Sequence, residues 1–145
     1  MKNLDIPPIW LIGSAAASWL LTQFLPVLMI NFPNWLGWVV AVLGLSWAVS
    51  ANVLLARAKT TVDPRKKPTT LVVNFSFKVN RNPIYTGMTI MLLGWAVVLG
   101  AITAFLPVIA FPIIISRRFI PKEEQSLLEA FGDEAVEYLR STRRW

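Results

Sequence analysis

Two long stretches of the chain carry no charged residue. The first runs from residue 6 to residue 56 and contains 51 residues, and the second runs from residue 82 to residue 116 and contains 35. A helix needs about 20 apolar residues to cross the roughly 30 Å hydrocarbon layer of a membrane. The first stretch is therefore long enough for two spans, over about residues 8–30 and 35–56, divided by the turn-forming segment Asn31-Phe32-Pro33-Asn34.

The second stretch has one weak point for a helix, at residues 100–103, which read Gly-Ala-Ile-Thr. A break there predicts two shorter spans over about residues 84–100 and 103–119, the second kinked by Pro107 and Pro112. One helix across the whole stretch would be about 52 Å long at 1.5 Å per residue, far more than the hydrocarbon layer requires. A hairpin of two spans is the better prediction.

Beyond the last span, Pro121 begins a helix and Gly132 ends it, with Asp133 placed to cap a second short helix. These helices, over residues 121–141, are expected to lie against the membrane face of the bundle. The fold predicted for residues 1–145 is therefore all-α: a single integral-membrane domain with a bundle of four transmembrane helices and a C-terminal helical segment.

The basic residues fall on one side of this predicted bundle, because the turns at residues 31–34 and 100–103 carry none. The loop over residues 57–83 and the tail hold Arg57, Lys59, Arg65, Lys66, Lys67, Lys78, Arg81, Arg117, Arg118, Lys122, Arg140, Arg143 and Arg144. Positive loops stay in the cytoplasm. Both termini, the loop and any active site are thus predicted to face the cytoplasm, in a prokaryotic inner membrane. The net charge of +6 is then a topology signal beside anionic membrane lipids, and nucleic-acid binding is not expected.

The composition excludes several kinds of chemistry. The chain has no cysteine and no histidine, so thiol catalysis, serine–histidine hydrolysis and zinc-dependent hydrolysis are excluded, and no metal site is expected. The absence of charge within the predicted spans disfavours a proton- or ion-coupled transporter. Any chemistry must come from the cytoplasmic ends of the helices.

One candidate segment leads into the third span, where residues 81–87 read Arg-Asn-Pro-Ile-Tyr-Thr-Gly. Asn82 precedes a proline and is pushed out of helical geometry, while Pro83 suits the first turn of the next helix. Arg81 and Asn82 then lie at a helix N-terminus, whose free N–H groups and dipole favour an anion such as a carboxylate. Taken alone, a membrane-anchoring arginine explains the same segment.

A second candidate segment follows the fourth span and begins with Glu123 and Glu124, which are expected to lie close to the membrane surface. Alone, these carboxylates are explained as complements to the dipole of the helix that they begin. The two segments together are much more specific than either one. Arg-Asn-Pro-x-Tyr-x-Gly before one span, with Glu-Glu-x-x-Leu-x-x-x-Phe-Gly after the next, resembles the isoprenylcysteine carboxyl methyltransferase and phospholipid methyltransferase superfamily.

This resemblance covers residues 71–144, about half the chain. It implies an integral-membrane enzyme that uses S-adenosylmethionine, bound in a pocket that the C-terminal segment roofs over the last helical hairpin. The residues that match the motifs of the superfamily are Arg81, Asn82, Pro83, Tyr85, Gly87, Glu123, Glu124, Phe131, Gly132 and Tyr138. The chain departs from the pattern at Asn82, where eukaryotic members have histidine, at Phe75-Ser76, where glycine-proline is common, and at Ala135, where a tyrosine is common.

The resemblance also implies roles for individual residues. The expected cofactor contacts are Lys78, Arg81, Asn82, Pro83, Tyr85, Gly87 and Glu123. The catalytic candidates depend on the lipophilic acceptor, whose identity the sequence leaves open: Arg81 or Arg118 would hold a carboxylate, whereas Glu124 would accept the proton of an amine. Since the methyl group of a sulfonium is already reactive, the protein need only align donor and acceptor and exclude water.

Two alternatives remain at this point. A non-enzymatic scaffold or small-solute carrier would have the same architecture, and the missing tail tyrosine favours it slightly, whereas the intact pair of glutamates argues against it. A reductase of the related sterol-reductase membrane fold would need a nicotinamide cofactor, and 145 residues is short for that larger bundle.

Overall fold

The computed structural model describes residues 5–61 and 68–145. Its elements are α1 (Pro7–Phe24), α2 (Asn34–Arg57), α3 (Ser76–Val79), α4 (Pro83–Leu99), the 3-10 turn η2 (Ile102–Ala104), α5 (Phe105–Arg118), α6 (Ile120–Phe131) and α7 (Asp133–Ser141). Over these residues the all-α prediction is confirmed. The basic residues Arg65, Lys66 and Lys67, which helped to predict the orientation, lie outside the described residues.

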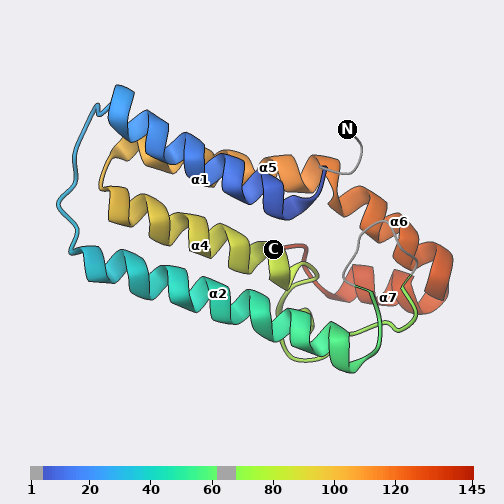
Figure 1. Cartoon of the computed structure of the whole chain (residues 1–145). Helices are drawn as coiled ribbons and strands as arrows, with labels where there is room; N and C mark the ends of the chain where they lie inside the picture. The colour runs from blue at the N-terminus through green and yellow to red at the C-terminus, as the bar shows by residue number, and fades with distance from the viewer. Residues whose placement is uncertain (1–4, 62–67) are drawn as a thin grey trace.

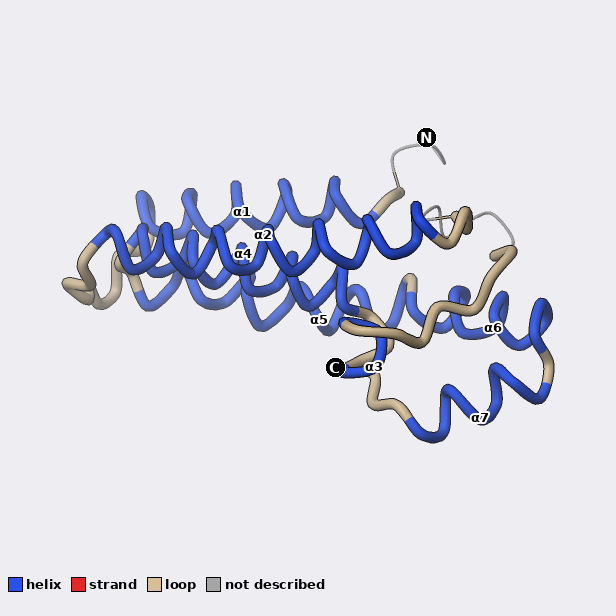
Figure 2. Tube along the Cα trace, turned by 90° about the horizontal axis from the view of Figure 1, so that it is seen from below, coloured by secondary structure: helices blue, strands red, loops and turns tan. Residues whose placement is uncertain are grey.

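The four long helices run along a common direction, with α4 between α2 on one side and the pair of α1 and α5 on the other (Figure 1). Helices α6 and α7 project beyond the end of this bundle where α1 begins and α2 ends (Figure 2). The basic residues at the ends of α2 and α5 and just before α4 therefore gather at one end of the molecule.

Two helical stretches among the described residues are long and apolar enough to cross a membrane. They are Asn34–Arg57 and Ile102–Phe131, in which an 18-residue window has a mean hydropathy of 2.1 and 1.6, respectively. The apolar helix Pro83–Leu99 is shorter. Membrane-spanning helices are thus supported at two of the predicted positions, while the four-span arrangement remains a proposal.

The first predicted span ends earlier than expected. Helix α1 stops at Phe24 rather than near residue 30. The reason is Pro26, because the residue before a proline is disfavoured in helical geometry, and Leu25 has left it, with φ −137° and ψ 60°. The segment between α1 and α2 passes beside the turn that follows α4. There the N–H of Ile30 donates a hydrogen bond to the carbonyl of Gly100 at 2.6 Å.

The predicted break between the third and fourth spans is confirmed. Helix α4 ends at Leu99, and Gly100 follows with a left-handed φ of 68°, which favours glycine because it has no Cβ. The C-terminal helices also form as predicted, with the break at Gly132, whose φ is 52°. Asp133 does not cap α7 with its side chain, because it is already the first helical residue and Gly132 takes the cap position.

Helices α2 and α4 approach each other closely at glycines. A Cβ added to Gly94 would lie 2.5 Å from the carbonyl oxygen of Gly37 and would also clash with the backbone nitrogen of Ala41. A Cβ on Gly87 would meet the carbonyl oxygen of Gly44 at 2.6 Å. Such small residues allow backbones to pack tightly inside a membrane, where no hydrophobic effect drives helices together. This packing fixes the end of α2 beside the start of α4.

Candidate active site

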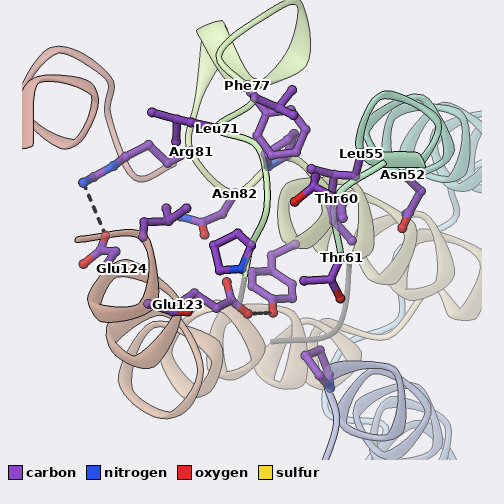
Figure 3. A pocket seen from close by; sticks show the side chains of 18 of the residues that line it. Asn52, Leu55, Thr60, Thr61, Leu71, Phe77, Arg81, Asn82, Glu123 and Glu124 are labelled. Atoms are coloured by element: carbon purple, nitrogen blue, oxygen red, sulfur yellow. Dashed lines mark hydrogen bonds and ion pairs between the residues drawn. The ribbon is translucent and has the colours of Figure 1, made fainter. Parts of the chain in front are cut away.

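A cavity of about 510 Å³ lies at the end of the bundle to which α6 and α7 are attached. Its walls come from segments far apart in the sequence: residues 6–8 at the start of α1, Asn52 and Leu55 near the end of α2, Met88 on α4 and Leu127 on α6. Figure 3 shows its polar end, where Arg81, Asn82, Glu123 and Glu124 gather. The cavity is therefore apolar over much of its wall and charged at one end.

The turn before α4 places two of these polar residues. Asn82 takes a non-helical conformation before Pro83, and its N–H donates a hydrogen bond to Oδ1 of Asn80 at 3.1 Å. The same Oδ1 accepts a hydrogen bond from the hydroxyl of Thr86 at 3.3 Å. Asn80 and Asn82 are both buried. These bonds fix the turn and direct the side chain of Arg81 to the cavity.

The two adjacent glutamates have different partners. Glu123 accepts a hydrogen bond from the hydroxyl of Tyr85, which joins α6 to α4. Glu124 lies 3.3 Å from the guanidinium of Arg81 and 2.5 Å from that of Arg144. Among the residues that the structure describes, no ion pair is formed by Glu123. Glu124 is thus neutralised by two arginines, whereas the partner of Glu123 within the described part of the chain is the hydroxyl of Tyr85.

Burial leaves one donor at this site without a partner. The side chains of Arg81 and Glu124 are only 15% and 18% exposed. Nε of Arg81 is buried and has no hydrogen-bond partner within the described part of the chain. A buried guanidinium N–H without an acceptor is costly, so its presence indicates a place where an anionic ligand would be stabilised.

Tyr138 supports the segment that precedes the site. Its hydroxyl donates a hydrogen bond to the carbonyl of Phe77 at 2.8 Å, which joins α7 to α3. Burial raises the pKa of Tyr138 to about 12, against a smaller lowering effect of Arg81. The hydroxyl therefore stays protonated near neutral pH and remains a donor. Tyr138 also lines the cavity.

The structure brings together most of the nine residues that were predicted as cofactor contacts or catalytic candidates. Those that line the cavity are Arg81, Asn82, Pro83, Tyr85, Glu123 and Glu124. Three others do not line it. Lys78 is exposed on α3, Gly87 serves the contact with α2, and Arg118 points elsewhere.

Arg118 is held by the N-terminal segment instead. Its guanidinium donates hydrogen bonds to both carboxylate oxygens of Asp5, the shortest at 2.8 Å, and lies 5.4 Å from the ring centre of Trp10. The hydrogen bond from Arg118 lowers the pKa of Asp5. Because Arg118 is committed to this pair and lies away from the cavity, the structure does not support the predicted contact with an acceptor.

The sequence analysis missed Arg144, which contacts Glu124 through Nε at 3.0 Å as well as through Nη2. The basic residues of the tail were assigned only to topology, and nothing in their local pattern distinguishes this one. Its role arises from a contact between segments 20 residues apart along the chain.

A model of the phospholipid methyltransferase family matches residues 32–134. An uncharacterized protein of Haemophilus influenzae is 39% identical over 62 residues, which cover 43% of this chain and 98% of that protein. No solved structure matches the chain significantly. Since the family match spans well over half of the sequence and includes both motifs, the chain belongs to the phospholipid methyltransferase family.

Proposed function

We propose that this chain transfers a methyl group from S-adenosylmethionine to the amine of a lipophilic acceptor, at the polar end of the cavity. The observation that carries this proposal is the pairing of the two glutamates. Glu123 faces the cavity with the hydroxyl of Tyr85 as its partner, whereas the arginines at the site are both directed to Glu124. Among the described residues, Glu123 is thus the carboxyl group at the site without a cationic partner, and it is placed to bind a cation or to accept a proton.

The residues present fit the amino-acid end of the cofactor, which carries a carboxylate and an amino group. Arg81, with its buried and unpartnered Nε, would hold the carboxylate. Asn82 and the N-terminus of α4 lie beside it, where the helix dipole also favours an anion. When bound, S-adenosylmethionine supplies a methyl carbon whose bond to sulfur breaks with the electron pair going to sulfur as the acceptor nitrogen forms its new bond.

Glu123 is the group best suited to handle the proton of an amine. An ammonium headgroup must lose one proton before its nitrogen has a lone pair for attack, and the carboxylate of Glu123 would accept that proton and pass it to water. The sequence analysis gave this role to Glu124. The oxygens of Glu124 are instead occupied by ion pairs with Arg81 and Arg144, which leaves them less accessible to the ammonium group of an acceptor.

The same geometry disfavours a carboxylate acceptor. A carboxylate acceptor would lie beside Glu123, which has no cationic partner among the described residues, and two charged carboxylates in a desolvated site repel strongly. Arg118, the other predicted holder of a carboxylate, lies with Asp5 outside the cavity. We therefore favour N-methylation over O-methylation.

The apolar wall of the cavity would receive the hydrophobic part of the acceptor, entering from the lipid between the start of α1 and the end of α2. Helices α1 and α4, with 18 and 17 residues, are about 27 and 26 Å long, which suits spans in a locally thinned bilayer. We infer four spans, with the basic end and the active site in the cytoplasm of a prokaryotic inner membrane.

The test is methyl transfer from S-adenosylmethionine labelled with tritium in the methyl group to a total bacterial lipid extract, catalysed by the detergent-purified protein. We expect the label in the lipid extract to stay non-volatile after mild alkali, because an N-methyl group is stable there, whereas a methyl ester is released as volatile methanol. Label released as volatile methanol would indicate a carboxylate acceptor. Absence of transfer by folded, monodisperse protein would favour the non-enzymatic scaffold or carrier.

A further inference from the structure

The residues that follow α7 fold back over the polar end of the cavity. The carbonyl of Arg143 accepts a hydrogen bond from the N–H of Arg81 at 2.9 Å, and the carbonyl of Arg144 accepts one from Nδ2 of Asn82 at 2.9 Å. The indole N–H of Trp145 donates to Oγ of Ser116 on α5 at 3.0 Å. This segment lies beyond residues 32–134, the part that the family model matches.

The side chain of Arg144 is the main partner of Glu124. Nε of Arg144 lies 3.0 Å from one carboxylate oxygen and Nη2 lies 2.5 Å from the other, which makes a two-pronged contact. Arg81 reaches the same carboxylate through a single nitrogen, Nη1, at 3.3 Å. The charge of Glu124 is thus satisfied chiefly by Arg144.

Because Arg144 makes most of the contacts with Glu124, Arg81 keeps N–H groups that can bind another anion. Its Nε is buried and unpartnered among the described residues, and its contact with Glu124 is long. Without the guanidinium of Arg144, Glu124 would keep Arg81 as its remaining cation at a largely buried site. The guanidinium of Arg81 would then turn fully onto Glu124, because a desolvated carboxylate without a partner is costly.

We propose that Arg144 is a positioning residue for the methyl donor: by binding Glu124, it keeps the guanidinium of Arg81 available for the carboxylate of the cofactor. This inference rests on the proposed function. It makes the affinity for a carboxylate-bearing ligand depend on a residue that does not itself touch that ligand.

The test is a calorimetric titration of the purified full chain with two ligands. S-adenosylhomocysteine carries the amino-acid carboxylate, whereas 5′-methylthioadenosine keeps the nucleoside and the sulfur but lacks that group. We expect Arg144→Gln to lower the affinity for S-adenosylhomocysteine about tenfold, which corresponds to the loss of about one charge-assisted hydrogen bond. The affinity for 5′-methylthioadenosine should stay within about twofold of wild type. Arg144→Lys should bind S-adenosylhomocysteine with an affinity between those of wild type and Arg144→Gln, because lysine keeps the positive charge but cannot make the two-pronged contact of a guanidinium.

Two further variants make the test specific. Arg143→Gln alters the neighbouring arginine, whose side chain reaches the carbonyl of Val79 and not Glu124, so it should bind S-adenosylhomocysteine as wild type does. The double variant Arg144→Gln with Glu124→Gln lacks the carboxylate that Arg81 contacts in the wild type. Its affinity for S-adenosylhomocysteine should return to within about threefold of wild type, a coupling that simple loss of structure would not produce.

The outcomes separate this inference from the proposed function. If wild type fails to bind S-adenosylhomocysteine, the proposed function is contradicted and this inference with it. If wild type binds and Arg144→Gln binds equally well, or loses both ligands to the same degree, or is not rescued by Glu124→Gln, the positioning role alone is wrong.

Discussion

A Glu123→Gln variant should transfer methyl groups at least about 100-fold more slowly than wild type, a typical effect of removing a general base. Glutamine has nearly the same size as glutamate, and its amide oxygen can still accept the hydrogen bond from Tyr85. The substitution removes the carboxylate that takes the proton of the acceptor. The measurement is the initial rate of tritium transfer to the lipid extract at saturating acceptor.

The matched control is Glu129→Gln, which removes the same charge from the same helix. Glu129 is exposed and accepts a hydrogen bond from Gln125 at 2.9 Å, and it does not line the cavity. We expect its rate to stay within about twofold of wild type, as for most surface changes. Full activity in folded Glu123→Gln would exclude Glu123 as the proton acceptor.

A Gly94→Leu variant should lose about 3 kcal/mol or more of its free energy of unfolding, or fail to fold. The backbone of α2 lies where the new side chain must go: a Cβ on Gly94 would already be 2.5 Å from the carbonyl oxygen of Gly37. The two helices must then separate, which also moves the α2 wall of the cavity. The measurement is thermal unfolding in detergent, followed by tryptophan fluorescence and size-exclusion chromatography.

Gly13→Ala is the control for this prediction. No atom lies within 4 Å of a Cβ added to Gly13, and alanine is a better helix former than glycine by about 1 kcal/mol. This variant should unfold at the same temperature as wild type or slightly above it. An unchanged unfolding temperature for Gly94→Leu would show that the close packing of α2 and α4 is not what holds the bundle together.

Much of the fold could be predicted from the sequence because charge and turn residues act locally. The charge-free stretches predicted the long helices, and Gly100 predicted the hairpin between α4 and α5. Helix pairing could not be predicted in the same way. Gly13 in the first helix faces open space, whereas Gly37 and Gly94 meet across α2 and α4. Which glycines meet depends on the packing of the whole bundle.

The candidate site shows the same limit. The motifs led to Arg81, Glu123 and Glu124, and the structure brings all three to one cavity. Arg118 was predicted as a possible holder of an acceptor carboxylate, but it forms an ion pair with Asp5 instead. Arg144 was overlooked because its carbonyl meets Asn82 only after 62 residues of chain have folded back. Residues at the cavity that belong to a motif could thus be found from the sequence, whereas those that act through contacts distant in sequence could not.

The proposed function requires that the cavity between the turn before α4 and the start of α6 binds the methyl donor. Calorimetric titration of detergent-purified wild type with S-adenosylhomocysteine, beside Arg81→Gln, tests this directly. We expect saturable binding of one ligand per chain in wild type and a clear loss of affinity in Arg81→Gln, which lacks the guanidinium that would hold the ligand's carboxylate. Absence of binding by folded, monodisperse wild type, or equal binding by both proteins, would contradict it.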